Sequence, residues 1–308
     1  MFEDNLTIRE TKRVQKHRNA VILVVVLIML TILPKLFLGG VFFPSLLNNI
    51  DAYKNLMPAD KMILGLLYGT VLSTVLIYIF AKKYLNHNDF SMGLKNPDRI
   101  KNYFKGAIFG FALITGVFLQ LKIRNLADIS PNYQNVNPGI FLIFFIGWVL
   151  QGFSEELMAR SVIMNYFAAE NGVKLAIIAN SLIFSIMHLG NDGFGVFPFI
   201  NIFLMGVIFS LMFYVSDDIF FPAAAHTFWN FAQGNIYGIN VSGISQSNIS
   251  LLKTQLVGNQ FLTGGAFGVE GGFLTFWMEA IIVGILLTAA KNKSNEEENK
   301  SKYKKTGL

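Results

Sequence analysis

Three polar motifs interrupt the hydrophobic runs of this chain and hold the side chains best suited to chemistry. They are Glu155-Glu156-Leu157-Met158-Ala159-Arg160, Phe184-Ser185-Ile186-Met187-His188 and His226-Thr227-Phe228-Trp229-Asn230. Of the four histidines in the chain, His17 and His87 lie in polar stretches, and the other two belong to these motifs. Ionisable side chains are costly in a bilayer, so those inside apolar segments mark a functional site by default. The sequence therefore indicates chemistry within a membrane.

The first motif offers a carboxylate for acid–base chemistry and a possible ion pair beside it. Glu156 and Arg160 are four residues apart, so a helix places them on one face, where they can pair. Such a pair is either a helix-end salt bridge near the cytoplasmic interface or a support for the site. Glu155 lies about 100° further round the helix and points elsewhere. An unpaired intramembrane carboxylate must face water or a partner group, and its desolvation suits general acid–base work.

The second and third motifs offer two histidines and an amide. A single histidine in a membrane helix is more often a hydrogen-bond partner between helices than a catalyst, but His188 and His226 occur together with Glu155. Asn230 lies four residues after His226 and so shares its helical face. Imidazole and amide N–H groups can together stabilise a developing oxyanion. The alternative for Asn230 is a polar clamp between two helices.

Counting residues along the expected helices places these side chains at different depths in the membrane. At 1.5 Å per residue, Glu155 and His226 come out about 5–10 Å from the cytoplasmic side and His188 about 20 Å. A tilted or late-starting fifth helix would remove this difference.

Three further polar residues lie in apolar runs outside the motifs. Asn180 and Asn201 are expected to be clamps between helices. Glu279 is a buried acid without an obvious partner, and it either lines the same cavity or braces a helix.

The composition is that of a polytopic membrane protein. The chain has 308 residues, of which 53% are hydrophobic and 14% are charged, whereas soluble domains carry about 25% charged residues. Its net charge of +6 comes from basic residues beside apolar runs, which is a topology signal rather than a nucleic-acid surface. The absence of cysteine excludes disulfides, thiolate catalysis, thiolate metal ligands and a C-terminal prenylation box.

The fold class expected is all-α, with about eight transmembrane helices around an intramembrane active-site cavity. A span needs about 20 apolar residues, and the first run is long enough to be a retained helix rather than a signal peptide. The expected helices are Ala20–Leu38, Met62–Ala81, Tyr103–Leu121, Gly139–Ala169, Val173–Leu189, Phe194–Val215, Ile219–Tyr237 and Gly272–Ala290.

The segments between and beyond these helices complete the domain organisation. Lysine and arginine gather in the N-terminal segment 1–19, in the second connection and in the tail 291–308, so both termini are expected on the cytoplasmic side. The tail is expected to be disordered, and 239–271 to be an external loop. The helices within 20–138 precede a catalytic core at 139–238.

In their order and placement, the three motifs resemble the CPBP intramembrane proteases. This family includes the CAAX prenyl endopeptidases and the bacterial Abi proteins linked to bacteriocin processing and self-immunity. The patterns EExxxR, FxxxH and HxxxN are complete here, on successive helices of an expected eight-span protein. The resemblance covers about Gly139 to Gly238.

The resemblance implies a role for each motif residue. Glu155 and His188 would activate a water molecule, and His226 and Asn230 would stabilise the oxyanion of the tetrahedral intermediate. The remaining pair, Glu156 and Arg160, would support this geometry.

Two mechanisms of water activation are considered for this family. We favour the metal-free glutamate mechanism, in which no cofactor is needed. In the alternative, Glu155, His188 and His226 form a three-ligand zinc site with an open position for water. The spacing is not the HExxH of soluble zinc peptidases, so no local pattern requires a metal.

The leading function is an intramembrane endopeptidase of a bacterial plasma membrane that cuts a peptide or membrane-protein substrate near the cytoplasmic leaflet. Its expected partners are that substrate and the lipid bilayer, without nucleic acid. One alternative is a catalytically silent immunity or scaffold protein. Another is a proton-coupled transporter, although no internal repeat supports it.

Overall fold

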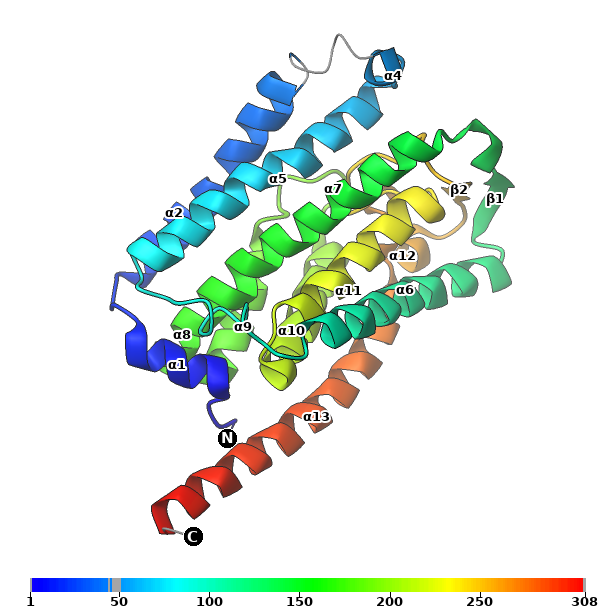
Figure 1. Ribbon diagram of the computed structural model, residues 1–308. Coiled ribbons are helices and arrows are strands. Elements are labelled where there is room, and N and C mark those ends of the chain that lie inside the picture. Colours follow the sequence, from blue (N-terminus) through cyan, green and yellow to red (C-terminus); the bar gives the residue numbers. More distant parts are fainter. Residues whose placement is uncertain (1, 44, 46–50, 307–308) are drawn as a thin grey trace.

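The structure is a computed structural model that describes residues 2–43, 45 and 51–306 (Figure 1). The long helices run side by side and form one bundle, as the composition predicts. In the described part of the chain, the sheet is a single antiparallel pair formed by β1 (Ala127–Pro131) and β2 (Leu252–Leu256). Ala127 lies opposite Leu256, and the sheet sits at one end of the bundle.

The first half of the chain contains α1 (Leu6–Val14), α2 (Ala20–Pro34), a π-helical segment (Lys35–Phe42), α4 (Asp51–Lys54), α5 (Pro58–Lys83) and α6 (Arg99–Ile123). A 3-10 turn (Tyr133–Asn135) precedes α7 (Pro138–Glu156), a second π-helical segment (Leu157–Met164) and α8 (Asn165–Asn171). Then come α9 (Val173–Ile186), α10 (Val196–Ser216), α11 (Phe220–Phe231) and its π-helical continuation (Ala232–Ile236). After β2 follow α12 (Gln260–Thr263), two 3-10 turns (Gly265–Phe267 and Val269–Gly271) and α13 (Phe273–Thr306).

Six helices in the described part of the chain are long and apolar enough to cross a membrane, so the expected count of eight is not confirmed. The two expected spans that fall short are the fifth and the seventh. The 14 residues of α9 extend about 21 Å, whereas the hydrocarbon core of a bilayer is about 30 Å thick. The seventh consists of the 12 residues of α11 and the 5 of its continuation, and most of α11 is buried. The six spans are Ala20–Phe42, Pro58–Lys83, Arg99–Ile123, Pro138–Asn171, Val196–Ser216 and Phe273–Lys300.

A continuous helical segment and its return helix set the depth of the first two motifs. Residues Pro138–Asn171 form one span of 34 residues, and Gly172 reverses the chain at a φ of 84°, where glycine is unstrained. Glu155 lies 17 residues before Gly172, and His188 lies 16 residues after it. The return helix therefore brings His188 back to the level of Glu155. The depth difference expected from the sequence does not exist, because Glu155 and His188 lie nearly the same number of residues from the turn at Gly172.

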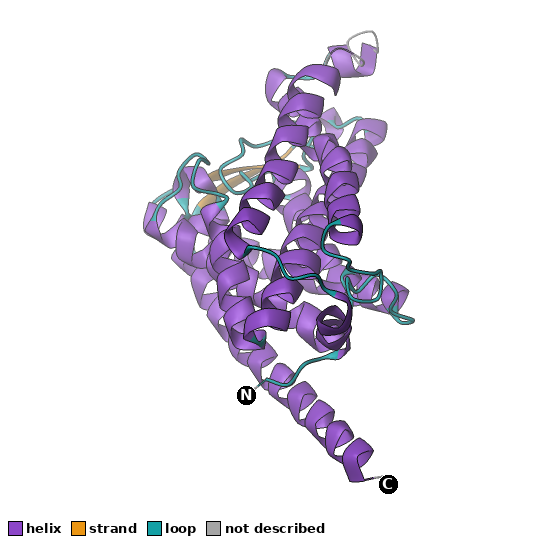
Figure 2. Cartoon of the chain, turned by 90° about the vertical axis from the view of Figure 1, so that its left-hand side faces the viewer, coloured by secondary structure: helices purple, strands orange, loops and turns teal. Residues whose placement is uncertain are grey.

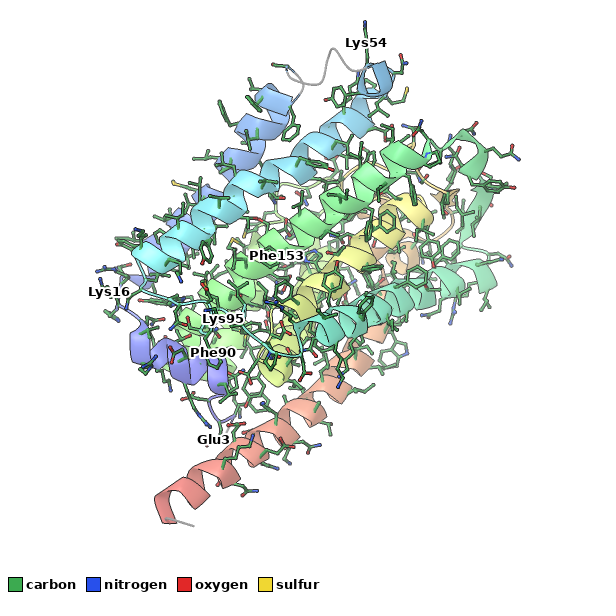
Figure 3. All side chains as sticks on the ribbon, viewed as in Figure 1. Glu3, Lys16, Lys54, Phe90, Lys95 and Phe153 are labelled. Atoms are coloured by element: carbon green, nitrogen blue, oxygen red, sulfur yellow. The ribbon has the colours of Figure 1, made fainter. Side chains whose placement is uncertain are left out.

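Both chain ends lie at the same end of the bundle (Figures 1 and 2). Glu3, Lys16 and Lys95 lie toward this end, and Lys54 lies at the opposite one (Figure 3). The charged tail differs from expectation, because α13 continues as a helix to Thr306 instead of becoming disordered at Lys291. An ion pair of 3.0 Å between Arg9 and the buried Glu297 ties this extension to α1.

The segment 239–271, expected to be an external loop, is packed on the helices by hydrogen bonds. Its centre is the carboxylate of Glu270, which accepts hydrogen bonds from Trp229 Nε1 (3.1 Å), Gln233 Nε2 (3.2 Å) and Ser242 Oγ (2.9 Å). The amide of Asn201 donates to the main-chain carbonyl of Glu270 at 2.7 Å. These bonds hold the segment against α10 and α11.

Two other polar residues noted in the apolar runs, Asn180 and Glu279, lie outside the cavity described next. Asn180 of α9 donates to Ser210 Oγ of α10 at 2.8 Å, so it clamps two helices as expected. Glu279 of α13 is 1% exposed, and its Oε2 has no hydrogen-bond partner within residues 2–43, 45 and 51–306. It is not among the residues that line the cavity described next.

Candidate active site

One cavity of about 250 Å³ is lined by Glu155, His188, His226 and Asn230. These four side chains come from α7, the turn after α9, and α11. Further polar groups on its wall are Lys35, Gln151, Asn191 and Ser242, and the apolar lining residues are Ile32, Leu66, Leu67, Trp148, Met158, Phe184, Met187, Val241 and Ile244, with Thr31 beside them. The tertiary structure thus gathers the three motifs around a single space.

Glu155 is paired rather than alone, which corrects the expectation of an unpaired carboxylate. The ammonium of Lys35 donates to Glu155 Oε1 at 2.8 Å, and only 19% of the lysine and 13% of the glutamate side chain is exposed. Sequence reasoning missed Lys35, although a lysine inside an otherwise apolar span is a signal in its own right. It lies directly after Pro34, where the first span changes from α-helix to a π-helical segment.

A close approach of two helices delivers Lys35 to the cavity. A Cβ added at Gly69 of α5 would lie 2.8 Å from Lys35 Cα and 3.0 Å from its carbonyl oxygen. Small residues allow membrane helices to approach at this separation. Glycine at this position is therefore a requirement for the contact between Lys35 and Glu155.

Glu156 and Arg160 form a buried ion pair that also holds His226. Arg160 Nη1 donates to Glu156 Oε1 at 2.8 Å, and His226 Nδ1 lies 2.9 Å from the same oxygen. Both members of the pair are fully buried. The guanidinium donates to the carbonyl of Gly206 at 3.2 Å and lies 4.6 Å from the ring centroid of Phe184. The pair is therefore buried in the middle of the span Pro138–Asn171 in contact with His226, and it is not a salt bridge at a helix end.

His226 lies between the two carboxylates of the first motif. Its Nδ1 contacts Glu156, and its Nε2 is 4.0 Å from Glu155 Oε2. The ring stacks on Phe209 with a centroid distance of 5.1 Å. Because a carboxylate can only accept, Nδ1 carries the hydrogen, and Nε2 is the nitrogen left for chemistry.

His188 is oriented by a similar contact. Its Nδ1 lies 2.8 Å from the main-chain carbonyl oxygen of Phe184. A carbonyl oxygen only accepts, so Nδ1 is the protonated nitrogen and Nε2 of the neutral ring keeps its lone pair. The ring is thus prepared to receive a proton at Nε2.

Asn230 retains hydrogen-bonding capacity. Its Nδ2 donates to Gln151 Oε1 at 3.1 Å, and an amide nitrogen carries a second hydrogen. Both side chains line the cavity. The second N–H is available to a group in the cavity.

The outer wall includes residues that no sequence pattern had indicated. Asn191 Nδ2 donates to the carbonyl oxygen of Ser242 at 2.7 Å, and both residues line the cavity. Asn191 lies in the turn after α9, and Ser242 lies in the segment 239–271. Neither position has a periodicity or motif from which its place could be predicted.

The donor set does not fit a zinc ion. Within residues 2–43, 45 and 51–306, no group of three or more His, Asp or Glu side chains is arranged to hold a metal. The ammonium of Lys35 lies 2.8 Å from Glu155, and a cation at this distance opposes binding of a second cation by the same carboxylate. The zinc alternative through Glu155, His188 and His226 is therefore not supported by this arrangement.

Residues 137–232 match a protein-family model, Rce1-like, described as type II CAAX prenyl endopeptidase Rce1-like. The match contains all six motif residues of the site, and it confirms the resemblance to the CPBP proteases. The match spans 96 of the 308 residues, less than half of the chain, and the family that it names is one of endopeptidases. No curated protein and no solved structure matches the chain. Lys35 and Ser242 lie outside the matched segment.

Proposed function

We propose that this protein is an intramembrane endopeptidase that hydrolyses a peptide bond with a water molecule activated by Glu155 and His188. The observation that carries the proposal is the convergence of Glu155, His188, His226 and Asn230 on one cavity. A base, a second proton acceptor and two oxyanion donors are the groups that peptide hydrolysis requires.

In the proposed reaction, a water molecule binds between Glu155 Oε2 and the histidines. Glu155 Oε2 and His226 Nε2 are 4.0 Å apart, so one water can contact both at about 2.8 Å with an angle near 90°. Glu155 takes a proton from this water with the help of His188, and the oxygen attacks the scissile carbonyl carbon. The C–N bond then breaks, and the proton passes from Glu155 to the leaving amine nitrogen.

The oxyanion of the tetrahedral intermediate is proposed to bind Asn230 Nδ2 and His226 Nε2. Since Nδ1 of His226 already donates to Glu156, donation from Nε2 requires the imidazolium form of the ring. The carboxylate of Glu156, 2.9 Å from Nδ1, stabilises this cation while Glu155 holds the proton taken from the water. The contact of Lys35 with Oε1 leaves Oε2 of Glu155 as the oxygen directed toward His226.

The proposed substrate is a peptide or membrane protein cut within reach of the cytoplasmic leaflet of a bacterial plasma membrane. A bacteriocin-like leader, a signalling peptide and a membrane-anchored regulator all belong to this class, and processing or self-immunity would be the biological setting. The name of the matched family also points to a prenylated substrate, which we consider the less favoured choice for a bacterium.

The test is cleavage of membrane peptides by purified protein in lipid nanodiscs, with Glu155→Gln as the key variant. Loss of a required general base is expected to lower kcat/KM by about 100-fold or more. Glu279→Gln is the matched control, because it removes a buried glutamate outside the cavity and should leave activity intact. A loss of tenfold or less in Glu155→Gln would exclude Glu155 as the base.

The same variant separates the enzyme from a silent immunity or scaffold protein. Membrane proteomes of cells with wild type or Glu155→Gln should differ in the abundance of substrate and product peptides. A cellular phenotype that survives Glu155→Gln intact would show that proteolysis is not the function. Activity that resists chelators would favour the glutamate mechanism over zinc.

A further inference from the structure

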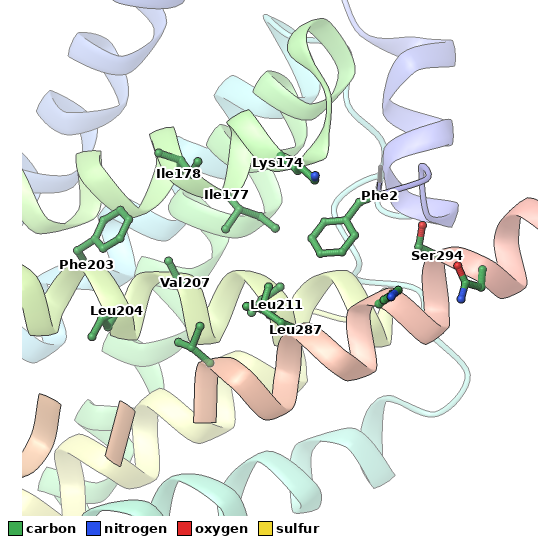
Figure 4. A pocket seen from close by; sticks show the side chains of 13 residues that line it. Phe2, Lys174, Ile177, Ile178, Phe203, Leu204, Val207, Leu211, Leu287 and Ser294 are labelled. Carbon is green, nitrogen blue, oxygen red and sulfur yellow. The ribbon is translucent and has the colours of Figure 1, made fainter. Parts of the chain in front are cut away.

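A second hollow lies between α9, α10 and α13, away from the candidate active site (Figure 4). It has a volume of about 660 Å³ and shares no lining residue with the cavity around Glu155. Its walls include the side chains of Phe2, Lys174, Ile177, Ile178, Val207 and Lys291. The groove is therefore separate from the proposed peptidase chemistry.

The groove is apolar along most of its length and basic at one end. On α13 its lining changes from Val283 and Leu287 to Lys291 over about two helical turns. Lys174, in the first turn of α9, borders the same end (Figure 4). Both lysines are exposed, and among the described residues neither forms an ion pair. Two unneutralised cations thus flank the mouth of an apolar channel.

This end of the groove faces the side of the bundle that carries both chain termini (Figures 1 and 4). Phe2 lines it, and the main-chain N–H of Glu3 donates to Ser294 Oγ at 2.8 Å. The membrane interface on the side rich in lysine and arginine is where anionic lipid headgroups are recognised by basic pockets between helices.

We propose that this groove is a binding site for an anionic phospholipid. The phosphate lies between Lys174 and Lys291, and an acyl chain extends along Ile177, Val207 and Val283. A free phosphate ion would use the two lysines but not the apolar channel, so the shape of the groove selects the lipid. The bound lipid would brace α13 against α9 and against the N-terminal segment.

The test compares how strongly the purified full-length protein retains phosphatidylglycerol and phosphatidylcholine, measured by native mass spectrometry. Wild type should retain phosphatidylglycerol preferentially, and the double variant Lys174→Ala/Lys291→Ala should weaken its binding about 30-fold. The matched control is Lys83→Ala/Lys101→Ala, which removes the same charge from exposed positions of α5 and α6 outside the groove. This control should keep the preference.

Two further arms separate the lipid from other occupants. Ile178→Trp fills the apolar part of the groove without changing its charge, and it should also reduce phosphatidylglycerol retention. Ile178 is 50% exposed, so the fold can accommodate the larger ring. Excess inorganic phosphate should not displace the lipid. Equal retention of both lipids, an equal loss in the control pair, or displacement by phosphate alone would each overturn the proposal. None of these readouts depends on peptidase activity.

Discussion

Replacing Glu156 by glutamine isolates the contribution of the buried carboxylate that joins Arg160 to His226. The substitution keeps the size of the side chain and removes its charge. Arg160 is then left as a cation with no exposed surface. Its remaining contacts include the carbonyl of Gly206 at 3.2 Å and the aromatic faces of Phe184 at 4.6 Å and Phe209 at 5.3 Å.

The expected loss of stability follows from this environment. Removal of one member of a buried ion pair costs about 3–5 kcal/mol, because the other charge stays desolvated. The carbonyl and the aromatic face offset part of this cost, since a cation–π contact contributes about 0.5–2 kcal/mol. We therefore expect the free energy of unfolding of Glu156→Gln to fall by about 3 kcal/mol.

A double variant separates folding from catalysis. In Glu156→Gln/Arg160→Met the uncompensated cation is gone, so the free energy of unfolding should recover by about 2 kcal/mol relative to Glu156→Gln. Activity should not recover, because His226 Nδ1 has lost its carboxylate in both variants, and both should be about 100-fold less active than wild type.

Unfolding in detergent by titration with SDS gives the free energies, and the peptide cleavage assay gives kcat/KM on the same preparations. If stability is unchanged within about 0.5 kcal/mol in Glu156→Gln, the pair is not desolvated and the reasoning fails. If the double variant regains activity together with stability, Glu156 serves folding alone.

Two further predictions concern Lys35 and the connection between α5 and α6. Gly69→Ala should lower cleavage at least tenfold, because the new Cβ would displace the Lys35 backbone 2.8 Å away, and Lys35→Met should lower it to a similar extent. Gly40→Ala, whose Cβ meets nothing within 4 Å, should be near wild type in the same assay. Burial lowers the pKa of His87 to about 4 from an ordinary 6.5. Between these pH values the unfolded chain therefore binds more protons than the folded chain. The free energy of unfolding should fall by up to about 3 kcal/mol as the pH drops from 6.5 to 4. His87→Gln should flatten that pH dependence in thermal unfolding curves, and an unchanged slope would contradict the assignment.

The sequence by itself determined the membrane class and the identity of the motif residues. Apolar runs of about 20 residues indicate helices that span a membrane, and charges inside them are costly enough to mark a functional site. The spacing of Glu156 and Arg160 also determined their pairing, because positions four apart on a helix are neighbours. These conclusions depend on composition and helical periodicity, which are local properties of the chain.

Only the tertiary structure decided how the motifs meet and what accompanies them. Helix packing set the depth of Glu155 relative to His188, because the turn at Gly172 lies 17 residues after the first and 16 residues before the second. It also brought Lys35 to Glu155 across 120 residues of sequence through the contact at Gly69. Hydropathy and spacing describe one helix at a time, whereas the approach of two helices depends on the shapes of both surfaces. That is why the carboxylate appeared unpaired in the sequence and is paired in the fold.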